Sequence, residues 1–213
     1  MNRARILIAD DHSVVIEGLR RILDRPQFDV VGVANDGRAL IQAAEKLHPD
    51  VIVTDVAMPR LNGLDAAREI HSRHPNLKII FLTMHPEVAY ATAALGAGAA
   101  GYVLKSAAGE ELIDAIGAAL NGRIYISKSI AKSVEYAREI RSRNGRGAVD
   151  LLTHRQREIL QQLAEGRQVK EIAAMLKLSP KTVEFHKYRI MKLLHLRTVA
   201  DLARYAQKRG IVA

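Results

Sequence analysis

Cysteine is absent from this chain of 213 residues, so the protein forms neither disulfides nor thiolate metal sites, and a reducing compartment is permitted. No apolar stretch approaches the roughly 20 residues that a membrane-spanning helix needs. The first residues run directly into an apolar segment and leave no room for a signal peptide. No Gly-x-Gly-x-x-Gly follows a predicted strand, which argues against dinucleotide binding. We therefore expect a soluble, cytoplasmic protein with no membrane partner.

The net charge of +9 is divided unevenly along the chain. Residues 1–120 contain 12 Lys/Arg and 15 Asp/Glu, whereas residues 121–213 contain 20 and 8. A basic half beside a mildly acidic half predicts a polyanion partner for the second half only. A solvated basic surface is the alternative, and charge alone does not distinguish the two.

Four apolar runs in the first half of the chain each end at a polar residue. The runs cover residues 6–9, 51–54, 79–82 and 102–104, and the residues that follow them are Asp10 and Asp11, Asp55, Thr83 and Lys105. Continuous apolar runs are typical of parallel strands buried on both faces. Because parallel strands all end at one edge of the sheet, these five polar side chains are expected to converge there.

The first 120 residues alternate strand patterns with helix patterns. A further strand is expected at residues 28–33, and helices are expected from residue 14 to before 26, at 37–47, from 63 to about 74, after 86 to about 96, and at 110–120. Five strands and five helices in strict alternation predict an α/β fold with a doubly wound, parallel, five-stranded sheet. We place this first domain at residues 1–122.

The rest of the chain has a different character. Residues 127–143 fit a helix, and Asn144-Gly145-Arg146-Gly147 suits a flexible connector, so we assign 123–148 to a helical and flexible linker. Residues 149–213 predict a small all-α domain of four helices. Thr153 and Gln156 fit a capping box, and Ser179-Pro180 fits the start of a helix. Two short helices joined through 177–179 predict a helix-turn-helix unit.

The carboxylates at the strand ends predict a metal site. Asp10, Asp11 and Asp55 supply the oxygen ligands that Mg²⁺ (or Mn²⁺) prefers, and such a cation stabilises charge on a transferring phosphoryl group. The Lys105 ammonium and the Thr83 hydroxyl would bind the other phosphoryl oxygens. A single aspartate after a strand is usually a helix cap, but three aspartates, a threonine and a lysine together at four strand ends favour a functional site.

The third helix of the second domain has two unlike faces. On a 100° wheel, Val183, Ile190 and Leu194 share one face, and basic and aromatic residues occupy the other. Lys and Arg there would contact phosphates or guanine, and Glu184 would accept from cytosine N4. Alternatively, the aromatic residues cover a neighbouring helix or a partner domain. The predicted DNA contacts are Lys181, Thr182, Glu184, Phe185, Lys187, Tyr188, Arg189 and Lys192.

The first domain resembles the receiver domain of bacterial response regulators, which share the CheY-like, flavodoxin-like fold. The motifs are Ile-Ala-Asp-Asp-His at 8–12, Asp-Val-Ala-Met-Pro at 55–59 with Asn-Gly-Leu at 62–64, Leu-Thr at 82–83, and Gly-Ala-Ala-Gly-Tyr-Val-Leu-Lys at 98–105. The resemblance implies that Asp55 is the phosphoacceptor, and that Asp10, Asp11, Asp55 and the Ala57 carbonyl hold Mg²⁺. It also implies that Thr83 and Tyr102 form a switch pair that reorients on phosphorylation.

Residues 151–211 resemble the LuxR/FixJ/NarL-type DNA-binding domain. The matching segments are Leu-Thr-His-Arg-Gln-Arg-Glu-Ile-Leu at 152–160, Ala-Glu-Gly at 164–166, Lys-Glu-Ile-Ala at 170–173, and Leu-Ser-Pro-Lys-Thr-Val-Glu-Phe-His at 178–186. Glu184 stands where many members carry lysine, so base preference should not be transferred from relatives. By resemblance, the last helix supplies the dimer contact on DNA.

Together the two resemblances imply a two-component response regulator of the NarL/FixJ type, not an enzyme. A sensor histidine kinase would phosphorylate Asp55, and the protein would then bind double-stranded promoter DNA as a homodimer, with RNA polymerase as a further partner. One alternative is a phosphatase of the haloacid-dehalogenase type, but that class places Asp-x-Asp after its first strand. Another is a small-molecule-sensing regulator, which would leave the strand-end residues without a purpose.

Overall fold

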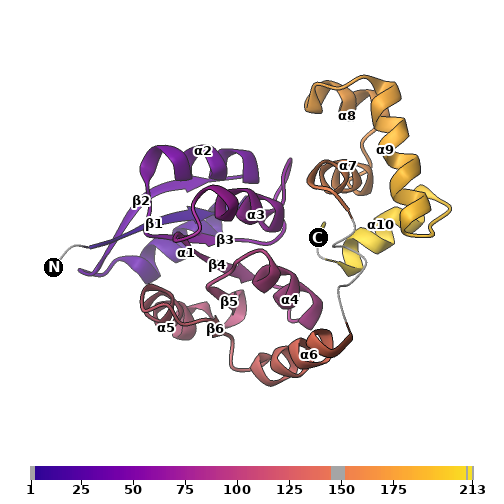
Figure 1. Ribbon diagram of the computed structural model, residues 1–213. Helices are drawn as coiled ribbons and strands as arrows, with labels where there is room; N and C mark the ends of the chain where they lie inside the picture. The colour runs from indigo at the N-terminus through magenta and orange to yellow at the C-terminus, as the bar shows by residue number, and fades with distance from the viewer. Residues whose placement is uncertain (1–2, 145–151, 210, 213) are drawn as a thin grey trace. The chain divides into compact units, whose positions relative to one another are not determined.

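The computed structural model describes residues 3–144, 152–209 and 211–212 and divides into two compact units (Figure 1). The first unit comprises Met1–Glu139 and the second Ile140–Ala213. Each unit has its own apolar core and is described separately.

A parallel sheet forms the centre of the first unit, with the strand order β2-β1-β3-β4-β5-β6. Alternate residues of each strand face opposite layers: Leu7 and Ile52 lie in one core cluster, and Ile8 and Val53 lie in the other. Both layers are buried, which explains why the strands are continuously apolar. The strands are β1 (Ala4–Ala9), β2 (Phe28–Ala34), β3 (Val51–Thr54), β4 (Lys78–Thr83), β5 (Gly101–Leu104) and β6 (Tyr125–Ile126).

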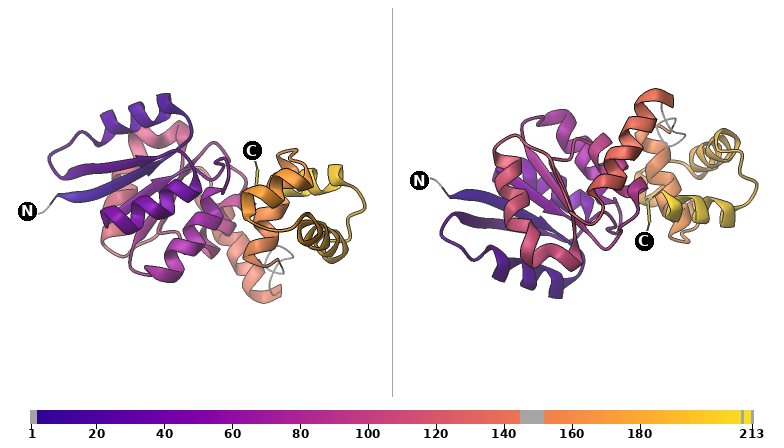
Figure 2. Two further views of the ribbon diagram at one scale, coloured as in Figure 1. Left: turned by 90° about the horizontal axis from the view of Figure 1, so that it is seen from above. Right: turned by 90° about the horizontal axis from the view of Figure 1, so that it is seen from below.

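Helices cover both faces of this sheet (Figure 2). Residues of α2, α3 and α4 pack in one cluster, and residues of α1 and α5 pack in the other. The predicted doubly wound α/β architecture is therefore confirmed. The helices are α1 (Ser13–Leu23), α2 (Gly37–Leu47), α3 (Gly63–Arg73), α4 (Val88–Gly96) and α5 (Ala108–Leu120), and a short 3₁₀ turn, η1 (Lys105–Ala107), precedes α5.

The predicted number of five strands was wrong, because the sheet has a sixth strand in the segment assigned to the linker. Tyr125 and Ile126 form β6, which pairs in parallel with Gly101 and Tyr102 of β5. Two residues are too few to show a strand periodicity, so this strand has no sequence signal of its own. It forms because the edge of β5 offers unpaired backbone groups.

The helix predicted within 127–143 is present as α6 (Ala131–Asn144). Val134 on this helix and Ile130 just before it are buried in the core of the first unit. The first compact unit therefore runs to Glu139 and includes part of the segment assigned to the linker. Residues 145–147 of the predicted flexible stretch lie outside the described residues.

Beyond the end of α6, the described part of the second unit contains the helices α7 (His154–Ala164), α8 (Val169–Leu176), α9 (Pro180–Leu193) and α10 (Val199–Lys208). The predicted capping box is formed, since the Thr153 amide donates to Gln156 Oε1 at 2.9 Å and the Gln156 amide to Thr153 Oγ1 at 3.3 Å. Lys177 adopts a left-handed conformation with φ of 53°, which ends α8 and turns the chain toward α9. The predicted helix-turn-helix is therefore present. Within the described ranges, no helix is long and apolar enough to cross a membrane.

Candidate functional site

Three of the predicted side chains meet at the carboxyl edge of the sheet. Asp10 follows β1, Asp55 follows β3, and Lys105 follows β5. The Lys105 Nζ lies 2.7 Å from Asp10 Oδ2 and 2.7 Å from Asp55 Oδ2. Both aspartates are buried, with 1% and 8% of their surface exposed. The convergence expected from the strand ends is thus observed at these three residues.

Asp55 is held through both of its carboxylate oxygens. The Val56 amide donates to Oδ1 at 2.6 Å, while Lys105 binds Oδ2. Burial raises the pKa of Asp55, and the hydrogen bond from Lys105 acts in the opposite direction. For Lys105, burial alone would lower the pKa, but its bonds to Asp10 and Asp55 outweigh it and the pKa is raised. The charged form of Asp55 is therefore disfavoured by burial, and additional positive charge nearby would stabilise it.

Asp11 and His12 lie beside this pair. Asp11 is exposed, and the His12 Nδ1 lies 2.9 Å from Asp11 Oδ1 and 3.2 Å from Asp10 Oδ1. Asp10, Asp11 and His12 each place one potential ligand atom within 4.8 Å of the others. The carboxylate oxygens suit Mg²⁺, and imidazole is a ligand that Mg²⁺ does not favour, so the donor set fits Mg²⁺ through the aspartates. Ala57 is partly exposed in the loop after β3.

The two predicted switch residues hold the loop between β4 and α4. Thr83 is fully buried, and its Oγ1 accepts from the His85 amide at 3.3 Å. Tyr102 is also fully buried, and its hydroxyl donates to the His85 carbonyl at 2.8 Å. Burial raises the pKa of Tyr102, so its hydroxyl stays protonated and remains a donor. Thr83 pairs in the sheet with Leu104, the neighbour of Lys105.

His85 is a further residue of the site, which the sequence did not predict. Its ring stacks on Tyr90 of α4, with 4.1 Å between the ring centroids and 4° between the planes. Its backbone amide and carbonyl are the groups that Thr83 and Tyr102 bind. No sequence signal identifies this residue, because its contacts depend on the conformation of the loop.

Gly63 fixes the backbone beside Asp55. A Cβ at this position would lie 1.9 Å from the Asp55 carbonyl oxygen, so only glycine fits without a backbone shift. The Gly63 amide donates to the Val56 carbonyl at 2.8 Å, and the Thr54 hydroxyl donates to the Asp55 carbonyl at 3.0 Å. Asn62 caps α3 by accepting from the Asp65 amide at 2.8 Å. The Asn-Gly pair therefore holds the start of α3 against the end of β3.

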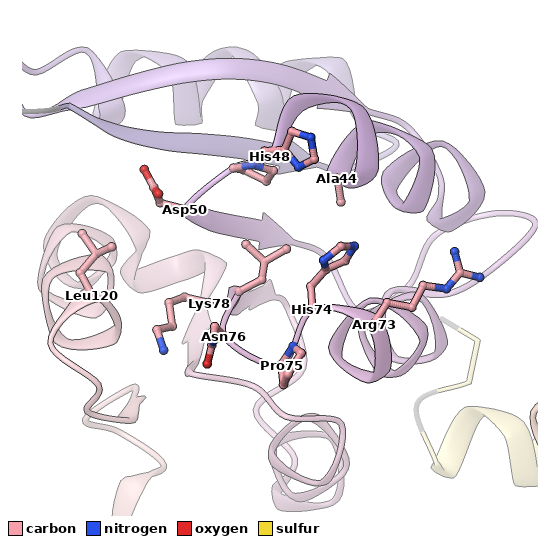
Figure 3. Close-up of a pocket in the computed structure, with 11 residues that line it drawn as sticks. Ala44, His48, Asp50, Arg73, His74, Pro75, Asn76, Lys78 and Leu120 are labelled. Atoms are coloured by element: carbon pink, nitrogen blue, oxygen red, sulfur yellow. The ribbon is translucent and has the colours of Figure 1, made fainter.

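The first unit also has a cavity of about 510 Å³, shown in Figure 3. Its lining includes His48, Asp50, His74 and Lys78, which lie near the amino ends of β3 and β4. Asp55 follows the carboxyl end of β3, so this cavity is separate from the carboxylate site. Arg73, which also lines it, is paired with Glu45 and Glu69.

The predicted DNA-contact face of α9 is exposed. Val183 and Ile190 on the opposite face are fully buried, as the wheel predicts. Phe185 and Tyr188 are 55% and 67% exposed, so the alternative in which they cover a neighbouring helix is wrong for the described residues. The remaining side chains of the face are exposed (Lys181, Glu184, Arg189 and Lys192) or partly exposed (Thr182 and Lys187).

Side chains on this face are ordered by contacts with one another. The Arg189 guanidinium lies over the Phe185 ring, 5.5 Å from its centroid. Lys187 Nζ lies 3.4 Å from Glu184 Oε1. A guanidinium over an aromatic face is a cation–π contact, which keeps the charge exposed while limiting its conformations. The face therefore presents cations and apolar ring edges side by side.

Comparison with known proteins accounts for both units. Residues 6–117 match the response regulator receiver domain family, and residues 150–206 match the luxR family of bacterial regulatory proteins. Response regulator GacA of Pseudomonas viridiflava is 36% identical over 98% of this chain and 97% of its own length.

Two solved structures are similar over both units. RcsB of Salmonella enterica serovar Typhimurium, bound to promoter rprA with the phosphomimetic BeF₃⁻, has 33% identity and a TM-score of 0.64, covering 96% of this chain and 98% of its own. A structure of two RcsB dimers bound to two parallel DNAs has 32% identity and a TM-score of 0.60, covering 97% and 98%. These similarities exclude the phosphatase alternative. The chain belongs to the NarL/FixJ-type response regulators, DNA-binding transcription regulators in which a receiver domain precedes a LuxR-type helix-turn-helix domain.

Proposed function

We propose that Asp55 is the phosphoacceptor of this regulator and that its phosphorylation controls promoter binding through α9. The observation that carries the proposal is the position of the Lys105 ammonium, 2.7 Å from a carboxylate oxygen of both Asp10 and Asp55. A buried aspartate beside a cation is suited to accept a phosphoryl group, since the cation can bind the oxygens that arrive with it.

Transfer requires a donor whose phosphoryl group approaches Asp55 in line. A sensor histidine kinase would supply it: a carboxylate oxygen of Asp55 bonds to phosphorus as the bond from phosphorus to the histidine nitrogen breaks. Lys105 would shift from the carboxylate pair to a phosphoryl oxygen. Asp10, Asp11, Asp55 and the Ala57 carbonyl would hold Mg²⁺, which would stabilise the charge on the transferring group.

The new phosphoryl group would then act on the β4–α4 loop. The Thr83 hydroxyl would turn from the His85 amide to a phosphoryl oxygen, which removes one of the two side-chain hydrogen bonds to the His85 backbone. Tyr102 holds the other through the His85 carbonyl and would reorient with the loop. Phosphorylation would therefore bias a two-state element next to the site.

DNA would be bound by the exposed face of α9 in the major groove. The promoter-bound structures of RcsB support this assignment, and its dimers on DNA support a homodimer as the active form. Partners at the promoter would include RNA polymerase, and the place of action would be the cytoplasm, where the promoter lies.

The site assignment is tested by incubating the protein with acetyl phosphate and Mg²⁺ and measuring its intact mass. We expect one phosphoryl adduct on the wild type and none on Asp55→Asn. Asp50→Asn is the matched control, because Asp50 precedes the same strand that Asp55 follows. Asp50→Asn should be phosphorylated normally, and chelation of Mg²⁺ should abolish the adduct on the wild type and on Asp50→Asn. An undiminished adduct on Asp55→Asn would contradict the assignment.

A further inference from the structure

Ser127 lies where three elements of the first unit meet. Its side chain is fully buried, just after β6 and before α6. The Ser127 amide donates to the Tyr102 carbonyl at 2.9 Å, and its Oγ accepts from the Leu104 amide at 3.0 Å. Ser127 is therefore bound to the backbone of a predicted switch residue and of the residue before Lys105.

The same residue also starts α6. The Ser127 carbonyl accepts from the Ile130 amide at 3.0 Å and from the Ala131 amide at 3.1 Å. These bonds form the first turn that leads into α6, and the chain continues from this helix to the DNA-binding unit. A displacement of the end of β5 thus has a direct hydrogen-bonded route to the beginning of α6.

Glu111 of α5 fixes Ser127 from the other side. Its carboxylate is buried, with 6% of the residue exposed, and it accepts from the Ser127 hydroxyl through Oε2 and from the Lys128 amide at 3.3 Å through Oε1. Within the described part of the chain these bonds come from a hydroxyl and an amide, not from a cation. A buried carboxylate of this kind costs stability that an apolar pair would avoid, so its presence points to a positional role.

We propose that Ser127 and Glu111 are positioning residues that couple the end of β5, with Tyr102 and Lys105, to the first turn of α6. The coupling rests on the proposed function, because its input is phosphorylation of Asp55. It differs from the proposed function in the output: movement of β5 is transmitted through Ser127 to the first turn of α6, in addition to the change in the β4–α4 loop. A merely structural pair would instead stabilise the unit without transmitting the state of the site.

The test is amide hydrogen exchange of the full chain, with and without Mg²⁺ and beryllofluoride, a phosphoryl mimic. In the wild type, beryllofluoride should change exchange both in the loop at 84–90 and at 128–136. Ser127→Ala keeps the backbone bonds of this position but removes the hydroxyl that joins the Leu104 amide to Glu111, so the change at 84–90 should remain and the change at 128–136 should fall by about tenfold. Exchange at Ile130 and Ala131 should also rise by about tenfold without ligand, because their bonds to the Ser127 carbonyl remain but the turn loses the bond from the Ser127 hydroxyl to the Glu111 carboxylate.

Two further variants separate coupling from stability. Glu111→Gln keeps the shape of the side chain and one acceptor oxygen, so it should fold even if Ser127→Ala does not, and should weaken the change at 128–136 by about threefold. Ile116→Val removes one buried methyl group from the same helix without touching the pair. It should destabilise the unit yet keep the full change at 128–136.

The outcomes are distinct. A wild-type response at 128–136 in both Ser127→Ala and Glu111→Gln would overturn the coupling, as would a response at 84–90 alone in the wild type. Loss of the response in Ile116→Val as well would also overturn it, because general loosening would then be the cause. If beryllofluoride changed exchange nowhere in the wild type, the proposed function of Asp55 would fail, and the coupling with it.

Discussion

The carboxylate site of the receiver draws Asp10, Asp55 and Lys105 from three different strand ends, whereas the predicted DNA-contact face comes from the single helix α9. The receiver residues are largely buried and bind one another, with Lys105 bridging two carboxylates at 2.7 Å. The residues of α9 are mostly exposed, and their contacts are weak ones along the same helix, such as Glu184 with Lys187 at 3.4 Å.

The receiver site depends on buried residues that bind one another, whereas the α9 face depends on exposed residues that act largely independently. Removing one member of the receiver site leaves a buried charge without its partner, so the effect is large and falls on the whole site. Removing one exposed side chain from α9 leaves the helix in place, because Val183, Ile190 and the partly buried Met191 pack it into the core. Effects on the DNA-contact face should therefore be smaller and separable.

The largest expected effect is that of Lys105→Met. Phosphorylation by acetyl phosphate should slow by about a hundredfold, since a positioned cation no longer binds the transferring group. Lys78→Met is the control, because Lys78 begins β4 at the opposite edge of the sheet. Initial rates from intact mass measure the effect, and circular dichroism checks that both variants fold. Equal rates for the two variants would show that Lys105 has no part in transfer.

Glu184→Ala should change which sequences are bound. If Glu184 accepts from a cytosine, its loss should relax selection at one base pair by about 1–3 kcal/mol and leave the other positions unchanged. Selection from a randomised duplex library measures this preference, with Glu165→Ala as a control outside α9. An unchanged selected site would show that Glu184 does not contact bases.

Lys192→Ala should weaken binding to every sequence to a similar extent. A phosphate contact carries no base information. Its loss should make the negative slope of log affinity against log salt shallower by about 0.9. Titrations of two unrelated duplexes at several salt concentrations provide the slope. Lys132→Ala on α6 serves as the control and should keep it. A loss confined to one duplex would assign Lys192 to base contact instead.

Electrostatic attraction between the receiver and the basic segment 151–213 is expected to lower the DNA affinity of the unphosphorylated chain by a smaller amount. Residues 151–213 contain 13 Lys/Arg and 5 Asp/Glu, and they are tethered to an acidic receiver. Tethering raises the effective concentration, so even a weak contact would compete with DNA. A fragment of residues 148–213 should therefore bind DNA more tightly than the unphosphorylated full chain, and the difference should shrink as salt increases. Equal affinities would leave dimerisation as the switch.

The sequence predicts the location of a side chain well where its position along a strand or helix is enough to determine it. Asp10, Asp55 and Lys105 follow apolar runs, and parallel strands bring such positions to one edge. The exposure of Phe185 and Tyr188 also follows from position, because helical periodicity separates them from the buried face.

Residues that join separate elements were not predictable in this way. Ser127 and Glu111 are sixteen residues apart and lie in none of the motifs identified in the sequence. Only the packing of α5 against β5 and β6 brings them together. The two-residue strand β6 depends on the same packing, since its backbone bonds come from β5. His85 likewise acquires its role only from the conformation of its loop.

The central claim is that the chemical state of Asp55 sets the DNA affinity of α9. It is tested most directly by titrating one selected duplex with wild type and Asp55→Asn, each with and without acetyl phosphate and Mg²⁺. We expect acetyl phosphate to tighten binding by the wild type by about 5- to 150-fold, the usual range for coupled sites, and to leave Asp55→Asn unchanged. The same affinity for the wild type in both conditions, or equal tightening of Asp55→Asn, would contradict the claim.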